Sequence, residues 1–339
     1  MHELALPLLV GLIVVALAFD YLNGLHDAAN SIATVVATRL LSPGVAVLFA
    51  AFFNFAAYFL TLTFPSLHKV AETIGGGLIA KDLITPSVIF GALIGAMFWN
   101  VVTWLKGIPS SSSHALVGGL IGAGVAHAGL TGVQWSGLNK TLIAIVLSPL
   151  LGMAIAMALM LLTSWLFSRA TNRAADKSFR ALHLMSSAAY SLSHGLNDAQ
   201  KTMGIITVLL YSTGYYSGKF EVPHWVAICC YVAIAMGTMT GGWKIIETMG
   251  SRITKLSQHQ GFCASMSGSI VVFTASLLGI PVSTTHTITG CVIGAGVSRR
   301  ASAVRWGVAQ SVVIAWVITI PASAAVGAVF YLLTVPFGG

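Results

Sequence analysis

Two short stretches of the chain place a carboxylate inside apolar sequence. The first is Gly24-Leu-His-Asp-Ala-Ala-Asn30, in which Asp27 directly follows His26. The second is Gly195-Leu-Asn-Asp-Ala-Gln-Lys201, in which Asp198 takes the place of Asp27. A charged side chain at the centre of a membrane costs about 2.5–3.5 kcal/mol even on a lenient insertion scale. Two aspartates at matching positions therefore indicate a function, which would be to bind a cation, to carry a proton, or both.

A purely structural role is the alternative for these aspartates. Lys201 lies three residues after Asp198 and could neutralise it as an ion pair. The same explanation does not extend to Asp27, because the position that matches Lys201 is Asn30. We therefore predict that both aspartates take part in coupling, and that both would be metal ligands if the coupling ion is Na⁺.

A second pair of stretches carries hydroxyl groups. Gly107-Ile-Pro-Ser-Ser-Ser-Ser-His114 and Gly279-Ile-Pro-Val-Ser-Thr-Thr-His286 each precede a short, glycine-bearing apolar segment. Proline presets the first turn of a helix, and hydroxyl side chains cap its free N–H groups. A helix that starts inside a membrane aims those N–H groups and the positive end of its dipole at one point, which suits an anion. The predicted anion-binding residues are Ser110, Ser111, Ser112, Ser113, Ser283, Thr284 and Thr285.

Helix capping is the alternative for these hydroxyl groups, since serine and threonine often bond to nearby backbone groups. For one stretch alone, the two interpretations are evenly matched. Two copies, each with Gly-Ile-Pro before and histidine after, favour the anion site. A tetrahedral oxyanion has enough oxygen atoms to accept hydrogen bonds from both copies.

Further side chains near these stretches are candidates for proton relay or for support of the site. His26 is a credible proton partner for Asp27, and Asn197 holds the place of His26 in the second copy. Histidine titrates near neutral pH, so His114 and His286 could exchange protons, donate to an anion or cap a helix, with simple packing as the alternative. The full set of such candidates is His26, His114, His286, Gln200 and Lys201.

The composition of the chain places these motifs in a membrane. Hydrophobic residues make up 56% of the 339 positions, charged residues make up 8%, and the mean hydropathy is +0.88. A soluble domain carries about 25% charged residues, and a helix needs about 20 apolar residues to cross the hydrocarbon layer. Apolar runs recur at 4–19, 45–64, 86–105, 141–167, 224–240, 262–281 and 306–335. The chain is therefore predicted to be an all-α, polytopic membrane protein.

Neither a nucleic-acid partner nor a cysteine-based metal site is expected. The net charge of +8 comes from basic residues in short loops between apolar runs, which membrane topology explains. The four cysteines lie within apolar segments and show no CxxC spacing, so we interpret them as small core residues.

The polar motifs predict interruptions in the helices. The first helix is expected to break around Asn23-Gly24, so that the Asp27 stretch forms an interrupted or half-spanning helix. Residues 65–85 have the composition of an exposed loop. Residues 168–180 form the only strongly polar connector, which marks the boundary between two halves.

The register of the motifs indicates an internal duplication. Asp198 follows Asp27 by 171 positions (198 − 27), and His286 follows His114 by 172 positions (286 − 114). We therefore predict a first membrane repeat at 1–167, a cytoplasmic connector at 168–180 and a second membrane repeat at 181–339.

The distribution of basic residues predicts how the two repeats are oriented. Lys and Arg mark cytoplasmic loops, and they gather at 168–180, 244–255 and 299–305, whereas both ends of the chain carry almost none. The connector is therefore expected inside and both termini outside. Each half then crosses the membrane an odd number of times, which gives inverted-topology repeats with broken or re-entrant helices that meet at a mid-membrane site, a recurring design of secondary transporters.

At these residues the sequence resembles the inorganic phosphate transporter (PiT) family. The matching pieces are FDYLNGLHDAANSIATVV, SHGLNDAQKTMG, GIPSSSSHALVGG, GGWKIIETMG and GIPVSTTHTITG. The resemblance implies an inverted-repeat carrier that takes up phosphate together with a cation. It also implies a phosphate-binding role for the Ser/Thr runs and a coupling role for Asp27, Asn30, Asn197 and Asp198.

Two positions differ from the sodium-coupled members of that family. His26 stands where those members usually have asparagine, and Asn54 stands about where they have an acidic residue. In this respect the chain resembles the bacterial low-affinity phosphate permease branch. That resemblance implies proton coupling and transport of phosphate as a metal–phosphate complex.

The expected function is secondary active import of inorganic phosphate, free or with a divalent metal, by symport with a cation, H⁺ being favoured over Na⁺. Moving a negative charge into a cell that is negative inside costs about 2.3 kcal/mol per 100 mV, so an anion that is accumulated needs accompanying cations. A passive anion channel that uses the same hydroxyl groups is the alternative. The expected location is the plasma (inner) membrane, in contact with its lipids, and a homodimer is left open.

An enzyme and a cofactor are not expected. A hydrolase built from serine, histidine and aspartate is disfavoured because Ser113 and His114 are sequence neighbours and both copies of the motif are kept. The chain also has no Gly-x-Ser-x-Gly nucleophile elbow.

Overall fold

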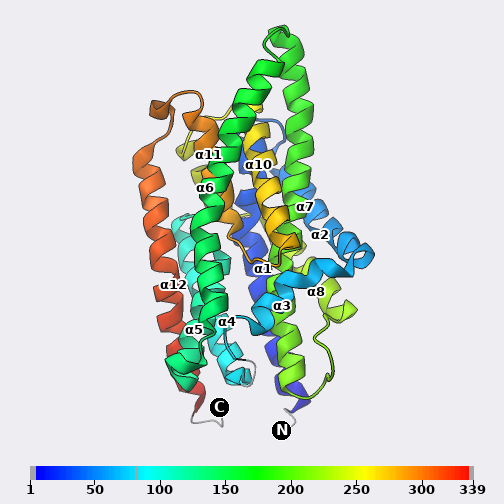
Figure 1. Ribbon diagram of the computed structural model, residues 1–339, viewed down its shortest axis with the longest axis vertical. Coiled ribbons are helices and arrows are strands. Elements are labelled where there is room, and N and C mark those ends of the chain that lie inside the picture. Colours follow the sequence, from blue (N-terminus) through cyan, green and yellow to red (C-terminus); the bar gives the residue numbers. More distant parts are fainter. Residues whose placement is uncertain (1–4, 81–82, 336–339) are drawn as a thin grey trace.

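The computed structural model of the protein describes residues 5–80 and 83–335, and these residues form a helical bundle (Figure 1). The α-helices are α1 (Leu6–Ala37), α2 (Pro43–Thr63), α3 (Lys69–Gly76), α4 (Pro86–Lys106), α5 (Ser112–Ala128), α6 (Trp135–Leu166), α7 (Asn172–Ser212), α8 (His224–Thr240), α9 (Trp243–Glu247), α10 (Gln258–Leu277), α11 (Thr284–Val297) and α12 (Trp306–Thr334). A short π-helix, η4 (Thr248–Arg252), continues from α9.

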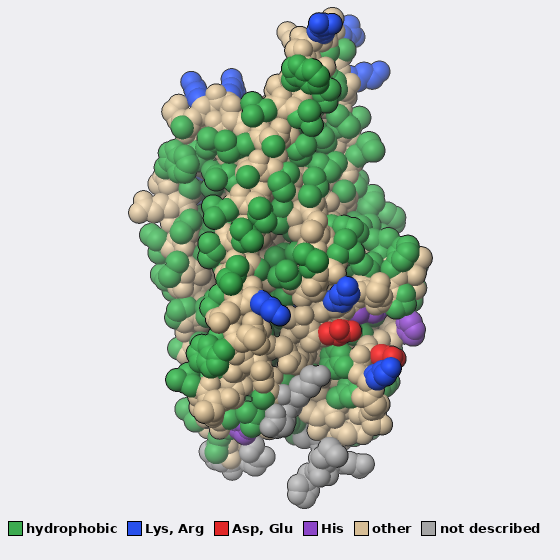
Figure 2. Space-filling model, in the orientation of Figure 1, with side chains coloured by type: hydrophobic (Ala, Val, Ile, Leu, Met, Phe, Trp, Pro, Cys, Tyr) green, Lys and Arg blue, Asp and Glu red, His purple; other side chains and the backbone are tan. Residues whose placement is uncertain are grey.

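Six of the described helices are long and apolar enough to cross a membrane, namely α1, α2, α4, α6, α10 and α12. A seventh span is formed if α8 is joined to the segment 243–252, which bends away from it by 69°. Hydrophobic side chains cover much of the face in Figure 2, where Lys and Arg side chains lie at the upper end and others lie in the lower half near Asp and Glu side chains. The prediction of an all-α, multi-pass membrane protein is confirmed.

The predicted break at Asn23-Gly24 is wrong, because α1 continues through both residues. Gly24 instead allows close packing of α1 on α8, since a Cβ at this position would collide with the carbonyl oxygen of Ile234. Gly237 of α8 approaches the Tyr21 carbonyl of α1 in the same way. Small residues bring membrane helices into close contact, and here they keep the polar face of α1 buried without interrupting its backbone hydrogen bonds.

Two helical hairpins turn back inside the bundle. The pair α4 and α5 occupies the lower half of Figure 1, and the pair α10 and α11 occupies the upper half. Each turn begins at the glycine of a Gly-Ile-Pro stretch, and Gly107 and Gly279 have φ angles of 65° and 71°. Side chains other than glycine are strained there. The hydroxyl runs consequently lie at the N-termini of α5 and α11, in the interior of the protein.

The Gly-x-x-x-Gly pairs of the hairpins pack them against long neighbouring helices. Cβ atoms at Gly118 and Gly122 of α5 would collide with the backbone of α12, and those at Gly290 and Gly294 of α11 would collide with the backbone of α6. Each hairpin therefore lies directly against one long helix.

The predicted exposed loop at 65–85 is wrong for much of its length. It contains α3, whose residues Val70, Ala71 and Ile74 are buried against α7. Gln200 of α7 accepts hydrogen bonds from the backbone N–H groups of Val70 (3.2 Å) and Ala71 (3.4 Å). Eight helical residues between polar flanks give a weak sequence signal, which explains the error. Residues 81 and 82 of this segment lie outside the described residues.

α3 also holds the turn of the α10–α11 hairpin. Lys69 Nζ donates to the carbonyl oxygen of Leu277 (3.3 Å), at the end of α10. Thr73 Oγ1 donates to the carbonyl oxygen of Gly279 (2.7 Å), where the chain turns towards α11. Both bonds satisfy carbonyl groups that the end of a helix leaves without an intrahelical partner.

The segment formed by α9 and η4 holds the turn of the α4–α5 hairpin with the same residue types. Lys244 Nζ donates to the Leu105 carbonyl (3.0 Å), and Thr248 Oγ1 donates to the Gly107 carbonyl (3.1 Å). We call each pair of Lys and Thr side chains that bonds to a hairpin turn a clamp. Both clamps have the spacing Lys-x-x-x-Thr, and Thr248 follows Thr73 by 175 positions (248 − 73). The sequence analysis missed this third repeated motif.

The predicted connector is mostly helical. α7 already begins at Asn172, so the turn between α6 and α7 is confined to 167–171. This turn lies at the upper end of the molecule, whereas both ends of the described chain lie at the lower end (Figure 1). The terminal residues 1–4 and 336–339 lie outside the described residues.

Candidate functional site

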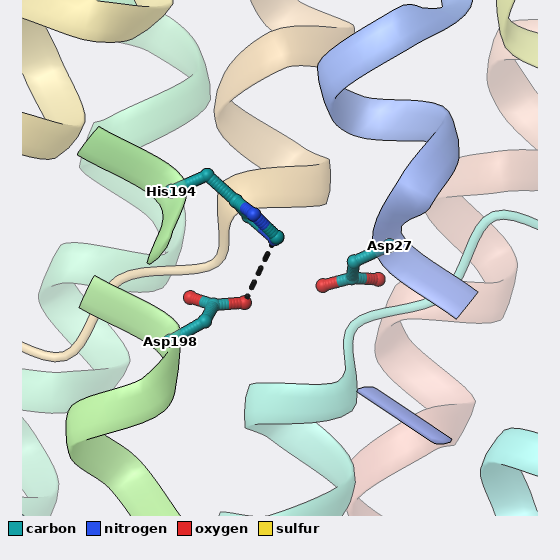
Figure 3. Close-up of side chains that lie close together, drawn as sticks. All are labelled: Asp27, His194 and Asp198. Carbon is teal, nitrogen blue, oxygen red and sulfur yellow. Dashed lines mark ion pairs between the residues drawn. The ribbon is translucent and has the colours of Figure 1, made fainter. Parts of the chain in front are cut away.

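α1 and α7 carry the two aspartates towards one another in the centre of the bundle (Figure 3). Asp27 and Asp198 are 1% and 0% exposed, respectively. We call Asn23, His26, Asp27 and Asn30 the first half-site, and the residues 171 positions later, His194, Asn197, Asp198 and Lys201, the second half-site.

In the first half-site, hydroxyl groups and an imidazole surround the carboxylate. Ser112 Oγ donates to Asp27 Oδ2 (3.0 Å), and Thr285 Oγ1 donates to Asp27 Oδ1 (3.3 Å). His26 Nδ1 lies 3.0 Å from Asp27 Oδ1. Thr284 Oγ1 also lies within hydrogen-bond distance of Asp27, at 3.4 Å from Oδ2. Among the described residues, no lysine or arginine pairs with this carboxylate.

The His26 imidazole connects Asp27 to α4 through a chain of hydrogen bonds. Its Nε2 atom lies 3.1 Å from Thr103 Oγ1 and 3.4 Å from Ser110 Oγ. Ser110 Oγ in turn donates to Thr103 Oγ1 (2.9 Å). Such a chain can pass a proton, because the two ring nitrogens exchange donor and acceptor roles with the tautomer.

In the second half-site, an ammonium group neutralises the carboxylate. Lys201 Nζ donates to Asp198 Oδ1 at 2.5 Å. His194 Nε2 lies 3.4 Å from the other carboxylate oxygen, Oδ2 (Figure 3). Thr284 Oγ1 lies 3.3 Å from this same Oδ2 atom, so one hydroxyl group of α11 is within reach of both aspartates.

The seven predicted anion-binding residues have three kinds of surroundings. Ser112, Ser113, Thr284 and Thr285 reach the charged groups of the half-sites. Ser111 and Ser283 are instead the N-caps of α5 and α11. Each accepts a backbone hydrogen bond of 3.2 Å, from His114 and His286 respectively. Capping therefore describes these two hydroxyls, whereas Ser110 contacts Thr103 and His26 as described above.

The asparagines of the half-sites have different surroundings. Asn30 Nδ2 donates to Thr285 Oγ1 (2.9 Å) and Thr284 Oγ1 (3.3 Å), so Asn30 lies at the tip of α11. Its Oδ1 atom is buried without a hydrogen-bond partner among the described residues. Asn197 Nδ2 donates to Ser276 Oγ of α10 (2.9 Å), a residue outside both half-sites and both hydroxyl runs, and Asn197 Oδ1 is likewise buried without a hydrogen-bond partner among the described residues.

His114 and His286 contact one another. Their ring centroids are 4.1 Å apart in an edge-to-face arrangement, and His286 stacks on Trp316 of α12 with a centroid distance of 3.7 Å. Both rings line an apolar cavity between α6 and α12. Within the described residues, neither ring hydrogen-bonds to Asp27 or Asp198, so packing is the role that their contacts support.

His194 is a candidate site residue that was not predicted from the sequence. Its Nδ1 atom lies 3.1 Å from Asn54 Oδ1, which can only accept, so Nδ1 carries a hydrogen and Nε2 is the ring nitrogen that lies towards Asp198. The offset of 171 positions between the two aspartates could have identified His194, because the same offset pairs His194 with Asn23 and Asn197 with His26. The two half-sites thus exchange the positions of asparagine and histidine.

Asp27, His194 and Asp198 could together hold a metal ion. Each offers one ligand atom, and these atoms lie within 4.8 Å of one another. Carboxylate and imidazole groups are common ligands of divalent metals. The sequence analysis expected no cysteine-based metal site, and these three residues come from two helices that only the fold brings together.

Asp20 is a third buried acid of the described chain. It lies two turns before Asp27 on α1 and is 0% exposed. Asn23 and Thr202 are its polar neighbours, but neither Asp20 oxygen has a hydrogen-bond partner among the described residues. The sequence analysis assigned no role to this residue.

Comparisons with known proteins agree with this architecture. The sequence model of the phosphate transporter family matches residues 23–327. The chain is 61% identical to a probable low-affinity inorganic phosphate transporter of Rhizobium meliloti, over 97% of both chains. It is 38% identical to a protein of the same description from Bacillus subtilis, over 98% of both chains. It also resembles a solved sodium-dependent phosphate transporter, with a TM-score of 0.87 and 25% identity, over 98% of this chain and 100% of the other.

Proposed function

Because the chain belongs to the phosphate transporter family, we propose that it imports inorganic phosphate by symport with a cation, and that H⁺ is favoured over Na⁺ as that cation. Phosphate would bind at the N-termini of α5 and α11, and the cation would bind at Asp27 and Asp198. One observation carries this proposal: Thr284 Oγ1, at the anion-binding helix end, lies within 3.4 Å of both carboxylates.

The anion part of the proposal rests on the two hairpin tips. Ser112 and Ser113 begin α5, and Thr284 and Thr285 begin α11. Each helix N-terminus adds a positive dipole end and free N–H groups. Four hydroxyls and two helix ends offer donors from two sides, which suits the tetrahedral arrangement of phosphate oxygens.

Coupling follows from the shared position of the anion and cation sites. The hydroxyl groups that would donate to phosphate donate to the carboxylates in this structure. A negative carboxylate repels phosphate, so a proton or cation on Asp27 favours phosphate binding and releases the hydroxyl groups to the anion. The membrane potential opposes anion entry by about 2.3 kcal/mol per charge per 100 mV, and the bound cation offsets this cost.

The preference for H⁺ rests on the histidines. His26 lies 3.0 Å from Asp27 and His194 lies 3.4 Å from Asp198, so each carboxylate has an imidazole that can exchange a proton with it. The solved relative is described as sodium-dependent, and Na⁺ therefore stays the second candidate for this chain.

Transport of phosphate together with a divalent metal is part of the proposal. Asp27, His194 and Asp198 offer three metal ligands next to the proposed phosphate site. A divalent cation bound there would be cargo that neutralises the charge of phosphate, and it would leave the site together with the anion.

Alternating access would arise from two inverted repeats. The duplicated aspartate, hydroxyl and Lys-x-x-x-Thr motifs support a duplication. The hairpins lie in opposite halves of the molecule, which supports the inversion (Figure 1).

We place the protein in the inner membrane with the connector inside and both termini outside, because the basic residues gather at the connector end (Figure 2). Membrane lipids would cover α6 and α12, and a homodimer stays a prediction.

Uptake of labelled phosphate into proteoliposomes tests the proposal when proton and sodium gradients are imposed separately, with and without Mg²⁺. We expect an inward proton gradient to drive accumulation above equilibrium, a sodium gradient alone to drive little, and Mg²⁺ to increase uptake. Accumulation with the sodium gradient alone would reverse the assignment of the ion. Equilibration without accumulation under every gradient would identify a passive anion channel.

A further inference from the structure

The second half-site contains a cation that belongs to the protein. Lys201 matches Asn30 of the first half-site, since the two positions are 171 residues apart. Its side chain is 1% exposed and is among the largest fully buried side chains of the described residues. A lysine is rarely buried completely unless it is paired, so its contacts indicate what the ammonium group does.

The ammonium group of Lys201 is bound by three oxygen atoms of different kinds. It donates to the carboxylate of Asp198, to the hydroxyl group of Ser113 and to the backbone carbonyl of Val282, the last at 3.2 Å. Carboxylate, hydroxyl and carbonyl oxygens are also the groups that replace water around a hard metal cation such as Na⁺. The three oxygens come from α7, α5 and the segment before α11, so the ammonium group joins both hairpins to α7.

The first half-site lacks such a fixed charge. Its Asn30 holds the matching position with a neutral amide, whose Oδ1 atom is buried without a hydrogen-bond partner among the described residues. A buried polar atom without a partner calls for an explanation, and an ion that binds transiently is one. Asn197 Oδ1 of the second half-site is also without a partner among the described residues, so the two half-sites differ in charge rather than in free amide oxygens. Within the described residues Asp27 has no ammonium partner and can accept a mobile cation, whereas Asp198 is already neutralised.

We propose that Lys201 is a built-in cation that replaces one coupling ion, so that only the first half-site loads an ion from solution in each transport cycle. This inference rests on the proposed symport function. Asp27 and Asp198 contribute two negative charges and Lys201 contributes one positive charge, so one mobile cation suffices to neutralise the pair of carboxylates. With asparagine at position 201, as at position 30, two mobile cations would be needed.

A tethered ammonium group cannot cross the membrane with phosphate. The protein therefore couples one cation fewer to each phosphate than a version with two empty half-sites would. Fewer coupled ions give a smaller maximal accumulation but allow transport when the external cation is scarce. Lys201 thus acts as a determinant of stoichiometry in addition to its role in the Asp198 ion pair.

The test compares Lys201→Asn with the wild type in proteoliposomes. The measured quantity is the number of cations per phosphate, obtained from the ion gradient at which net phosphate flux is zero. We expect this number to rise by one in Lys201→Asn. Lys140→Asn, a substitution of an exposed lysine on α6, is the matched control and should keep the wild-type number. An unchanged number in an active Lys201→Asn protein would overturn the inference.

A binding measurement keeps the inference testable if the variant does not transport. Thermal unfolding of purified protein is followed in detergent over a series of Na⁺, Li⁺ and choline concentrations. We expect Na⁺ or Li⁺ to raise the Tm of Lys201→Asn by several degrees more than that of the wild type, because the small ion replaces the ammonium group, and choline to have no such effect. Equal shifts in both proteins, or aggregation of the variant at every cation concentration, would show that the lysine is purely structural. If the wild type itself shows no cation-coupled uptake, the proposed function fails instead.

Discussion

The two half-sites have the same backbone setting and different charges. Each places an aspartate on a long, unbroken helix, next to the N-terminus of a hairpin helix that carries hydroxyl groups. Each aspartate also has one imidazole neighbour, although His26 precedes Asp27 directly and His194 precedes Asp198 by one helical turn. In the part of the chain that the structure describes, Asp198 has an ammonium partner and Asp27 has none.

This difference shows how two half-sites of similar structure can have different charges and therefore different roles. The parts that both copies keep are the carboxylate, the hydroxyl groups and the turn of the hairpin, which are the parts of the proposed anion and cation sites. The part that differs is the charge at Asn30 and Lys201, two side chains at matching positions. Loss of the same group in the two half-sites should therefore have unequal effects.

The largest effect is expected for Asp27→Asn. No lysine or arginine of the described residues pairs with this carboxylate, so it is the proposed loading site for the mobile cation. We expect gradient-driven accumulation of labelled phosphate in proteoliposomes to fall at least about 100-fold, since a charge-assisted interaction of about 3 kcal/mol is removed from the loaded state. Asp176→Asn, at an exposed acid near the start of α7, should leave uptake unchanged. Accumulation within twofold of the wild type in Asp27→Asn would contradict a coupling role for this residue.

Asp198→Asn should instead reduce stability more than any other single change in the site. It leaves the Lys201 ammonium group buried without its carboxylate, and breaking a buried ion pair costs about 3–5 kcal/mol. Thermal unfolding in detergent should show a large loss for Asp198→Asn, a small change for Asp27→Asn, and recovery of most of the loss in the double variant Asp198→Asn/Lys201→Met. Equal losses for the two aspartate variants would mean that the half-sites do not differ in charge as described.

Most of the residues of the two half-sites could be predicted from the sequence, but little of the geometry that brings them together could be. The aspartates and hydroxyl runs were recognisable because polar residues are conspicuous in apolar sequence, and their common register predicts a duplication. The predicted break at Asn23-Gly24 was wrong because glycine in a membrane helix serves close packing as readily as it serves a kink. No local pattern distinguishes these uses, since the neighbouring helix α8 is about 200 residues away in sequence.

Other parts of the site depend on contacts between distant segments. His194 faces Asp27 and Asp198 only because α1 and α7 are packed side by side (Figure 3). His114 and His286 follow similar motifs, and the sequence does not show that they contact one another and that His286 stacks on Trp316 of the distant helix α12. α3 was missed because a short helix between polar flanks has the composition of a loop.

Substitutions in the hydroxyl run should separate ligand contacts from caps. Ser112 Oγ donates to Asp27 (3.0 Å) and Asn23 (2.5 Å), so Ser112→Ala removes a hydrogen bond to a charged group, worth about 1.5–3 kcal/mol. We expect the KM for phosphate to rise about 10- to 150-fold. Ser111→Ala removes only a helix cap and should cost about 1 kcal/mol of stability with little change in KM. The reverse order of KM values would indicate that Ser111, not Ser112, faces the anion.

The smallest effects are expected at the two hairpin clamps, and there the halves should behave alike. Thr73 Oγ1 bonds to the Gly279 carbonyl and Thr248 Oγ1 bonds to the Gly107 carbonyl, and neither threonine contacts a charged group of a half-site. Thr73→Val and Thr248→Val each remove one neutral hydrogen bond, worth about 0.5–1.5 kcal/mol. Both should lower the Tm by similar, small amounts and leave the number of cations per phosphate unchanged. A change of that number in only one of the two variants would show that the asymmetry of the protein extends beyond the charges of the half-sites to the clamps that hold the hairpins.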